Sequence, residues 1–375
     1  MMQALVWLPV DNTALDVIQA QLRQRDVFTT GYERVGVDAY DPATYLHDQL
    51  LEETSFGFRY DRNVLSRLVE VVQGKPLSEE HRVACGIQVL AQIKEAVVEP
   101  NTALYELGSG CSHADAEEQL ALFRRIDHTH PQHWADLATG RADRFKAERL
   151  GDWEGNSARE DNYAKRLNRW SASYAACLKI ATLELSEMGA EARMLELIRW
   201  MEEDLCFLLP GLILANRYLA PNSCRGGLFK QLRSQDRGKA LKGIRNQAWD
   251  LALIYAWMED CRNIATTGKI VILASLDRRL HSIARSVLTA IELGRDEAIT
   301  TQQTIEREFF SAWGMARGQR LLGAWQAAQS RRQSHPERKR VLTLEDAREI
   351  ERFLEAQILL PITPLPQAAG NGQHC

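Results

Sequence analysis

Paired cysteines are missing from this chain. Its seven cysteines are dispersed along 375 residues, are odd in number and never form a C-x-x-C pair. Such spacing predicts neither a disulfide framework nor a zinc ribbon, and it makes a reducing cytoplasm the expected compartment.

Long apolar runs are missing too. The most apolar segment, 205–215, is interrupted by Pro210, whereas a bilayer-spanning helix needs roughly 20 apolar residues. The first residues have no basic stretch ahead of their short apolar run, unlike a secretory signal. We therefore expect a soluble, cytoplasmic protein with no membrane partner.

Several catalytic signatures are also absent. The sequence has no glycine-rich phosphate loop, no G-x-S-x-G element and no paired Cys/His nucleophile site. Basic charge is not in excess, since 46 lysines and arginines stand against 50 acidic residues. Nucleic-acid binding would therefore need a local basic surface. One basic run is a candidate for contacts with a phosphate backbone: Lys230, Arg233, Arg237, Lys239, Lys242 and Arg245.

Hydrophobic residues make up 45% of the chain, enough for one large core or two smaller ones. Three segments have the composition of strands, at 56–61, 96–100 and 269–275. Most of the remainder has helical periodicity. The polar, turn-rich stretch 26–55 is interpreted as a lead-in outside the core. Apolar strands followed by helices predict an α/β fold with a parallel sheet.

The predicted domain organisation follows from these segments. A core made of two separated parts is expected to surround a helical insertion, with helical flanks at both ends. The predicted parts are an N-terminal lead-in at 1–55, a first core part at 56–128, the insertion at 129–245, a second core part at 246–300, C-terminal helices at 301–360 and a disordered tail at 361–375.

Four carboxylates lie at informative places in this pattern. Asp61 ends the first predicted strand, and Asp277 follows the strand at 269–275. Asp250 lies in a predicted helix, and Glu106 follows the strand candidate at 96–100. Ligands of open parallel sheets gather beyond the carboxyl ends of the strands, so these acids are expected to converge. Crowded carboxylates repel one another unless a cation compensates them, which predicts bound Mg²⁺ or Mn²⁺.

The residues around these acids resemble those of the PIN-like nucleases. The similar pieces are Tyr60-Asp61-Arg62-Asn63, Glu106, Asp250-Leu-Ala-Leu253 and Ser275-Leu-Asp277, within residues 57–108 and 246–293. The resemblance implies a PIN-like parallel sheet core with a large helical insertion and helical flanks.

By the same resemblance, the protein would be a metal-dependent endonuclease that hydrolyses phosphodiester bonds. Asp61, Glu106, Asp250 and Asp277 would hold one or two divalent metals and form the catalytic site. Asn63 and Ser275 would be supporting polar groups that orient ligands or the substrate phosphate. RNA is favoured over DNA because the family mostly cleaves RNA.

Other interpretations of the same residues remain open. Asp61 and Asp277 are also suited to cap helices, and Asp250 to complement a helix dipole. In that case the chain would be a non-catalytic helical interaction or scaffold protein. A further alternative keeps the nuclease but makes it a toxin or defence effector that a regulatory protein partner controls.

Overall fold

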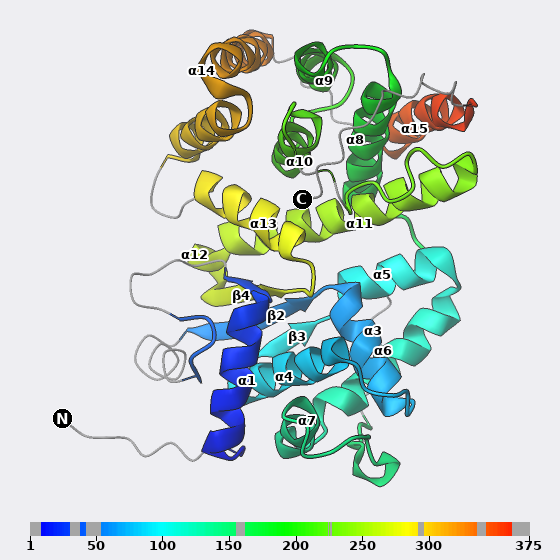
Figure 1. Ribbon diagram of the computed structural model, residues 1–375, viewed down its shortest axis with the longest axis vertical. Coiled ribbons are helices and arrows are strands. Elements are labelled where there is room, and N and C mark those ends of the chain that lie inside the picture. Colours follow the sequence, from blue (N-terminus) through cyan, green and yellow to red (C-terminus); the bar gives the residue numbers. More distant parts are fainter. Residues whose placement is uncertain are drawn as a thin grey trace, which may run out of the picture. The chain divides into compact units, whose positions relative to one another are not determined.

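The computed structural model describes residues 9–30, 38–42, 54–154, 162–223, 225, 227–291, 296–335 and 343–361. The chain divides into two compact units (Figure 1). Unit 1 comprises Met1–Arg166 and Ala256–Arg285, and unit 2 comprises Leu167–Tyr255 and Ser286–Cys375. Residues 129–166, expected to begin the helical insertion, therefore belong to unit 1.

Unit 1 contains a four-stranded sheet in the order β1-β4-β2-β3. Its strands are β1 (Phe28–Thr30), β2 (Ser55–Tyr60), β3 (Val97–Glu99) and β4 (Lys269–Ala274). Strand β2 is parallel to both β3 and β4, whereas β1 runs antiparallel to β4. The α/β class and the three predicted strands are confirmed. The interpretation of 26–55 as a lead-in outside the core is wrong for β1, because Phe28 is buried within the core.

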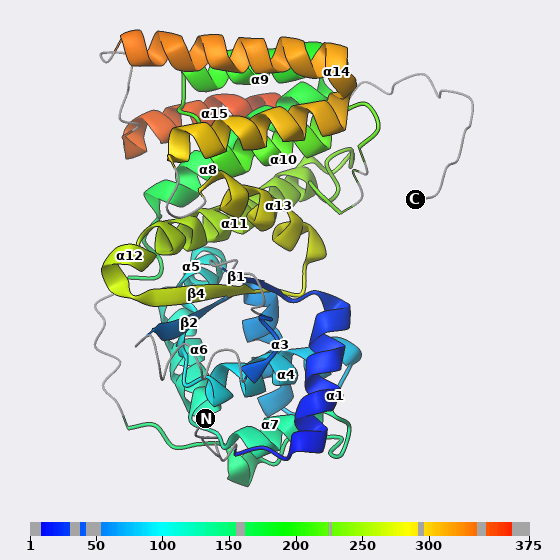
Figure 2. The ribbon, with the colours of Figure 1, turned by 90° about the vertical axis from the view of Figure 1, so that its left-hand side faces the viewer.

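Helices cover both faces of this sheet (Figure 2). On one face, the Tyr60 hydroxyl donates to Gln88 Oε1 at 3.0 Å, and the Tyr60 ring packs edge-on against Phe123. On the other face, Trp257 Nε1 donates to the Val271 carbonyl at 2.9 Å. Helices of unit 1 are α1 (Asn12–Arg25), α3 (Arg62–Val72), α4 (Glu79–Ile93), α5 (Asn101–Gly110), α6 (His113–Asp127), α7 (Pro131–Ala138) and α12 (Ile264–Thr267), together with the 3-10 turn Ala147–Arg149.

Burial on both faces explains the strand composition. Phe56, Phe58 and Tyr60 are all at most 2% exposed, as are Ile272 and Leu273 of β4. Strand β4 carries the near-continuous apolar run of a parallel strand that is covered on both sides, whereas in β2 the three aromatic residues alternate with Gly57 and Arg59.

The described residues of unit 2 are helical wherever they have regular secondary structure. Pro210 lies in the first turn of α10, where its missing N–H has no helical partner to lose. Helices of unit 2 are α8 (Asn168–Leu185), α9 (Ala190–Glu203), α10 (Leu209–Leu219), α14 (Glu297–Ser334) and α15 (Leu344–Leu359), and the unit boundaries fall within α11 (Arg237–Arg262) and α13 (Arg278–Ala290).

Helix α14 contains a break at Gly314, whose φ of 74° and ψ of 171° are not helical. Such a backbone conformation is accessible almost only to glycine. Elsewhere, the predicted tail falls outside the described residues from 362 onward. Among the described helices, none is both long and apolar enough to cross a membrane.

Candidate active site

Asp61 and Ser275 lie side by side because β2 and β4 are parallel and in register. Tyr60 pairs with Ala274, so the next residue of each strand leaves the sheet at the same edge. The Asp61 amide donates to the Ala274 carbonyl at 3.0 Å and extends the pairing by one residue. Two residues far apart in sequence thus share the carboxyl ends of adjacent parallel strands, which is where ligands of open parallel sheets bind.

Ser275 and Asn63 hold the Asp61 carboxylate. The Ser275 hydroxyl donates to Asp61 Oδ2 at 2.6 Å, and Asn63 Nδ2 donates to the same oxygen at 2.6 Å. Asn63 is itself fixed, because its Oδ1 accepts from the Leu276 amide at 3.1 Å. Asn63 and Ser275 therefore both contact Asp61, and their expected role in orienting ligands or the substrate phosphate stays a prediction.

Burial controls the ionisation of Asp61. The residue is 8% exposed, and burial raises its pKa to about 6, with the nearby charge of Asp277 as a further raising cause. The Ser275 hydrogen bond lowers the pKa, as do the N–H groups of Arg62 and Asn63 at the start of α3. Asp61 occupies the N-cap position of α3, yet its side chain makes no capping hydrogen bond. Its carboxylate is directed to Ser275 and Asn63 instead.

Asp277 does act as a helix cap. Its Oδ1 accepts from the Arg279 amide at 2.8 Å at the start of α13. Its own amide donates to the Ser275 hydroxyl at 3.0 Å, which joins it to the Asp61 network. Within the described part of the chain, Asp277 Oδ2 has no hydrogen-bond partner, so this half-buried carboxylate can accept a further ligand.

Glu106 lies within α5 and pairs with Arg62. Arg62 Nη1 donates to Glu106 Oε1 at 2.9 Å. Burial raises the pKa of Glu106 to about 7; the Arg62 charge lowers it and the Asp61 charge raises it. Gly108 belongs to the same helix and is buried. A side chain there would collide with the Tyr163 backbone, so glycine serves close packing.

His281 is a member of this network that the sequence did not reveal. The side chain is buried, its Nε2 lies 3.0 Å from the Ser275 carbonyl, and its Nδ1 lies 2.8 Å from the Thr29 hydroxyl. Since a carbonyl can only accept, Nε2 carries the proton and Nδ1 accepts from Thr29 in the neutral ring. Burial lowers the pKa of His281, which favours that neutral form. A lone histidine one turn into a helix gives no sequence signal for this role.

Asp250 belongs to unit 2, whereas the other three acids belong to unit 1. It lies in α11, where Gln247 Nε2 donates to its Oδ2 at 3.1 Å. Its charge also contributes to raising the pKa of the buried Cys177 thiol of α8. The structure thus places Asp61, Glu106 and Asp277 within one unit, and the role of Asp250 in a shared site stays a prediction.

The six basic residues of the run at 230–245 differ in their surroundings. Lys230 and Lys242 are exposed, Lys239 forms an exposed ion pair with Asp236, and Arg245 pairs with Glu355. Arg233 binds Glu184.

Arg237 is 8% exposed and donates to the carbonyls of Leu232, Ser234 and Ile358. Its expected contact with a phosphate backbone is wrong, because its guanidinium is buried and occupied with carbonyl groups of the chain itself.

Binding of Mg²⁺ or Mn²⁺ at these acids stays a prediction. Within the described residues, no group of three or more His, Cys, Asp or Glu side chains is assembled as a metal site. Burial is the main cause of the raised pKa values of Asp61 and Glu106, and the neighbouring carboxylates Asp277 and Asp61, respectively, add to it. Oxygen donors of this kind suit Mg²⁺ or Mn²⁺.

Comparisons with protein-family models, with characterised proteins and with solved structures found no match. Function is therefore inferred from the chain's own residues.

Proposed function

We propose that unit 1 is a metal-dependent endonuclease that hydrolyses phosphodiester bonds, with RNA favoured over DNA. The observation that supports it best is the convergence of Asp61 and Asp277 at the ends of two adjacent parallel strands, with Ser275 hydrogen-bonded to both. Glu106 adds a third carboxylate whose pKa responds to the Asp61 charge. The PIN-like resemblance is part of this proposal.

In the proposed reaction, Asp61, Glu106 and Asp277 of unit 1 would hold Mg²⁺ or Mn²⁺. When bound, such a cation lowers the pKa of a coordinated water and stabilises charge that develops on the phosphate. The residues of the chain supply positioning: Ser275 and Asn63 fix one oxygen of Asp61. Arg62 has a half-exposed guanidinium beside Glu106 and is suited to contact a substrate phosphate.

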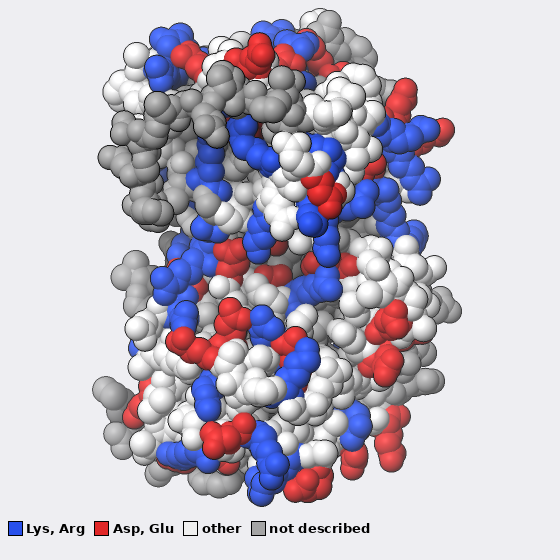
Figure 3. Space-filling model, turned by 45° about the vertical axis from the view of Figure 1, so that its right-hand side comes forward, with Lys and Arg blue, Asp and Glu red and all other residues white. Residues whose placement is uncertain are grey.

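Surface charge places a limit on substrate binding by unit 1. On the face drawn in Figure 3, acidic and basic side chains are interspersed over unit 1, in the lower part of that view. Unit 1 also contains ion pairs in which opposite charges offset each other, such as Arg67–Glu70 and Lys75–Glu70. A surface on which acidic and basic side chains alternate attracts a polyanion such as RNA only weakly. The bound metal and Arg62 would therefore have to make most of the favourable contacts with the substrate phosphate.

The first test measures cleavage of fluorescent single-stranded RNA and DNA with Mn²⁺ and with a chelator. We expect metal-dependent cleavage, and a loss of about 100-fold or more in the Asp277→Asn variant, because one metal ligand charge is removed. Asparagine can still cap α13, so the helix is kept. Asp296→Asn is the matched control, because Asp296 caps α14 through the same contact, with its Oδ1 2.8 Å from the Ala298 amide.

Cleavage that survives Asp277→Asn, or that continues without metal, contradicts the proposed site. An absence of cleavage together with no Mn²⁺ binding by calorimetry would favour the non-catalytic scaffold interpretation, which the capping contact of Asp277 also permits. A partner-controlled effector predicts instead that Mn²⁺ binds at Asp277 while the isolated protein cleaves slowly.

A further inference from the structure

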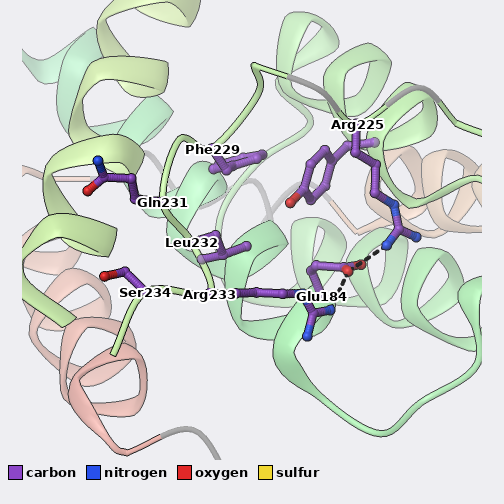
Figure 4. A pocket seen from close by; sticks show the side chains of 8 residues that line it. Glu184, Arg225, Phe229, Gln231, Leu232, Arg233 and Ser234 are labelled. Carbon is purple, nitrogen blue, oxygen red and sulfur yellow. Dashed lines mark hydrogen bonds and ion pairs between the residues drawn. The ribbon is translucent and has the colours of Figure 1, made fainter. Parts of the chain in front are cut away.

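Unit 2 contains a pocket of about 500 Å³ (Figure 4). It lies between the end of α8, the end of α10, Arg225 and residues 229–234. The lining residues are Glu184, Tyr218, Arg225, Phe229, Gln231, Leu232, Arg233 and Ser234. A volume of this size suits a small organic ligand such as a nucleotide.

Three arginines surround a single carboxylate at this pocket. Glu184 is 2% exposed, and its oxygens accept from Arg193 at 2.7 Å, from Arg225 at 2.6 Å and from Arg233 at 2.8 Å. In Figure 4, Arg225 and Arg233 approach Glu184 from two sides. One negative charge cannot balance three positive charges, so the cluster keeps a positive excess.

Part of each guanidinium remains available for a ligand. Arg233 uses Nη2 for Glu184, and among the described residues its Nε and Nη1 have no hydrogen-bond partner. Arg225 uses Nη1 for Glu184 and Nε for the Ser223 hydroxyl at 3.4 Å, while Nη2 has none in the same part of the chain. The two side chains are 39% and 49% exposed, so solvent reaches them.

The chain holds the wall of the pocket in an uncommon conformation. Phe229 and Gln231 have φ values of 47° and 61°, in the left-handed region. Non-glycine residues persist there when the surroundings fix them, and they concentrate at functional sites. Arg237 fixes this segment by donating to the Leu232 and Ser234 carbonyls at 2.8 and 2.9 Å. Gly243 contributes as well, because a side chain there would overlap the Lys230 carbonyl.

We propose that this pocket binds a phosphate group carried on a nucleoside. The N–H groups without a partner in the described part of the chain, on Nη2 of Arg225 and on Nε and Nη1 of Arg233, can donate charge-assisted hydrogen bonds to the oxygens of a phosphate. Tyr218, Phe229 and Leu232 provide an apolar wall for the base or sugar that the phosphate carries. A free mononucleotide and an RNA strand share this chemistry. The pocket lies in unit 2 and does not depend on the acids of unit 1.

Binding is measured by calorimetry with AMP, adenosine, inorganic phosphate and a five-nucleotide RNA with or without a 5′-phosphate. We expect AMP or the phosphorylated RNA to bind, with adenosine weaker by at least about tenfold, because it lacks the charged acceptor. If AMP binds, the ligand of the pocket is a free mononucleotide. If the RNA binds and AMP does not, the ligand is an RNA strand. No binding by any phosphate-bearing probe overturns the proposal and leaves the arginines as structural partners of Glu184.

Arg233→Gln should weaken binding by about tenfold or more, since one charge-assisted contact is lost. Arg199→Gln is the matched control: Arg199 is a comparably exposed arginine of α9 that pairs with Glu196 at 2.9 Å. Equal affinity of Arg233→Gln and wild type contradicts the proposal.

A wild-type measurement covers the case in which Arg233→Gln fails to fold. Phenylglyoxal labelling of Arg225 and Arg233, read by peptide mass spectrometry, should fall when AMP or RNA is bound. Labelling of Arg199 should not change. Unchanged labelling of all three with a bound ligand overturns the assignment to this pocket.

Discussion

Lys94 provides the sharpest test of the core of unit 1. It ends α4, is 1% exposed, and donates through Nζ to the Ala39 carbonyl at 2.9 Å. Its ammonium also lies about 6 Å from the ring centres of Phe28 and Phe58. Burial lowers the pKa of Lys94 from 10.5 to about 7.

That lowered pKa gives stability a defined pH dependence. Below pH 7 the Lys94 amine holds its proton in both the folded and the unfolded chain. Lys94 therefore does not make the free energy of unfolding depend on pH in that range. Between pH 7 and 10.5 the unfolded chain binds the proton more strongly, so the free energy of unfolding rises with pH. At about 1.4 kcal/mol per pH unit, the gain from pH 7 to pH 9 is about 2 kcal/mol.

Lys94→Met removes the titrating group while keeping a long flexible side chain. We expect urea denaturation of this variant to lose the Lys94 part of the rise in stability between pH 7 and pH 9. Lys75→Met, at an exposed lysine of unit 1 paired with Glu70, should keep the wild-type slope. Titration of ¹³C-labelled lysine by NMR should show one resonance with a pKa near 7 that disappears in Lys94→Met. An unchanged slope in Lys94→Met, or no such resonance, would refute the reasoning.

Three further substitutions test separate features of the fold. Ser275→Ala should destabilise unit 1 by about 1–3 kcal/mol in urea denaturation, since the buried Asp61 carboxylate loses a hydrogen bond; a change near zero would mean that Asn63 suffices. Gly243→Ala should cost about 2 kcal/mol or more, because the new methyl group overlaps the Lys230 carbonyl; wild-type stability would show that this segment shifts freely. Gly314→Ala should cost about 1–3 kcal/mol, since alanine does not tolerate its backbone angles, and an unchanged midpoint would show that α14 straightens without penalty.

Strand composition made part of the site predictable. Asp61 and Ser275 each follow an apolar strand, and parallel pairing in register then places them together. The sequence could not reveal that register, nor that Asp61 would direct its carboxylate to Ser275 while Asp277 caps its helix. Both acids satisfy the same local pattern, and only tertiary contacts distinguish them.

Other features lack any periodic signal. Strand β1 is three residues long and lies in a polar stretch, so only its pairing with β4 defines it. Asp250 lies in a helix, as predicted from the sequence, but it belongs to unit 2. The division into units depends on long-range packing, which the local sequence around Asp250 does not show. The pocket around Glu184 likewise forms from arginines of separate segments, which a local pattern cannot connect.

The order of strands has a consequence for synthesis of the protein on the ribosome. Strand β2 pairs on one side with β4, and the bond between Asp61 and Ser275 joins residues 214 positions apart. At about 5–20 residues per second, roughly 10–40 seconds separate the translation of these two residues. During that interval the ribosome makes the first part of unit 2. Strand β2 then still lacks the backbone hydrogen bonds that it later forms with β4. A chain that terminates before β4 contains Asp61 and Glu106 but can never acquire Ser275 and Asp277, so a nascent or truncated product would be harmless to its proposed substrate.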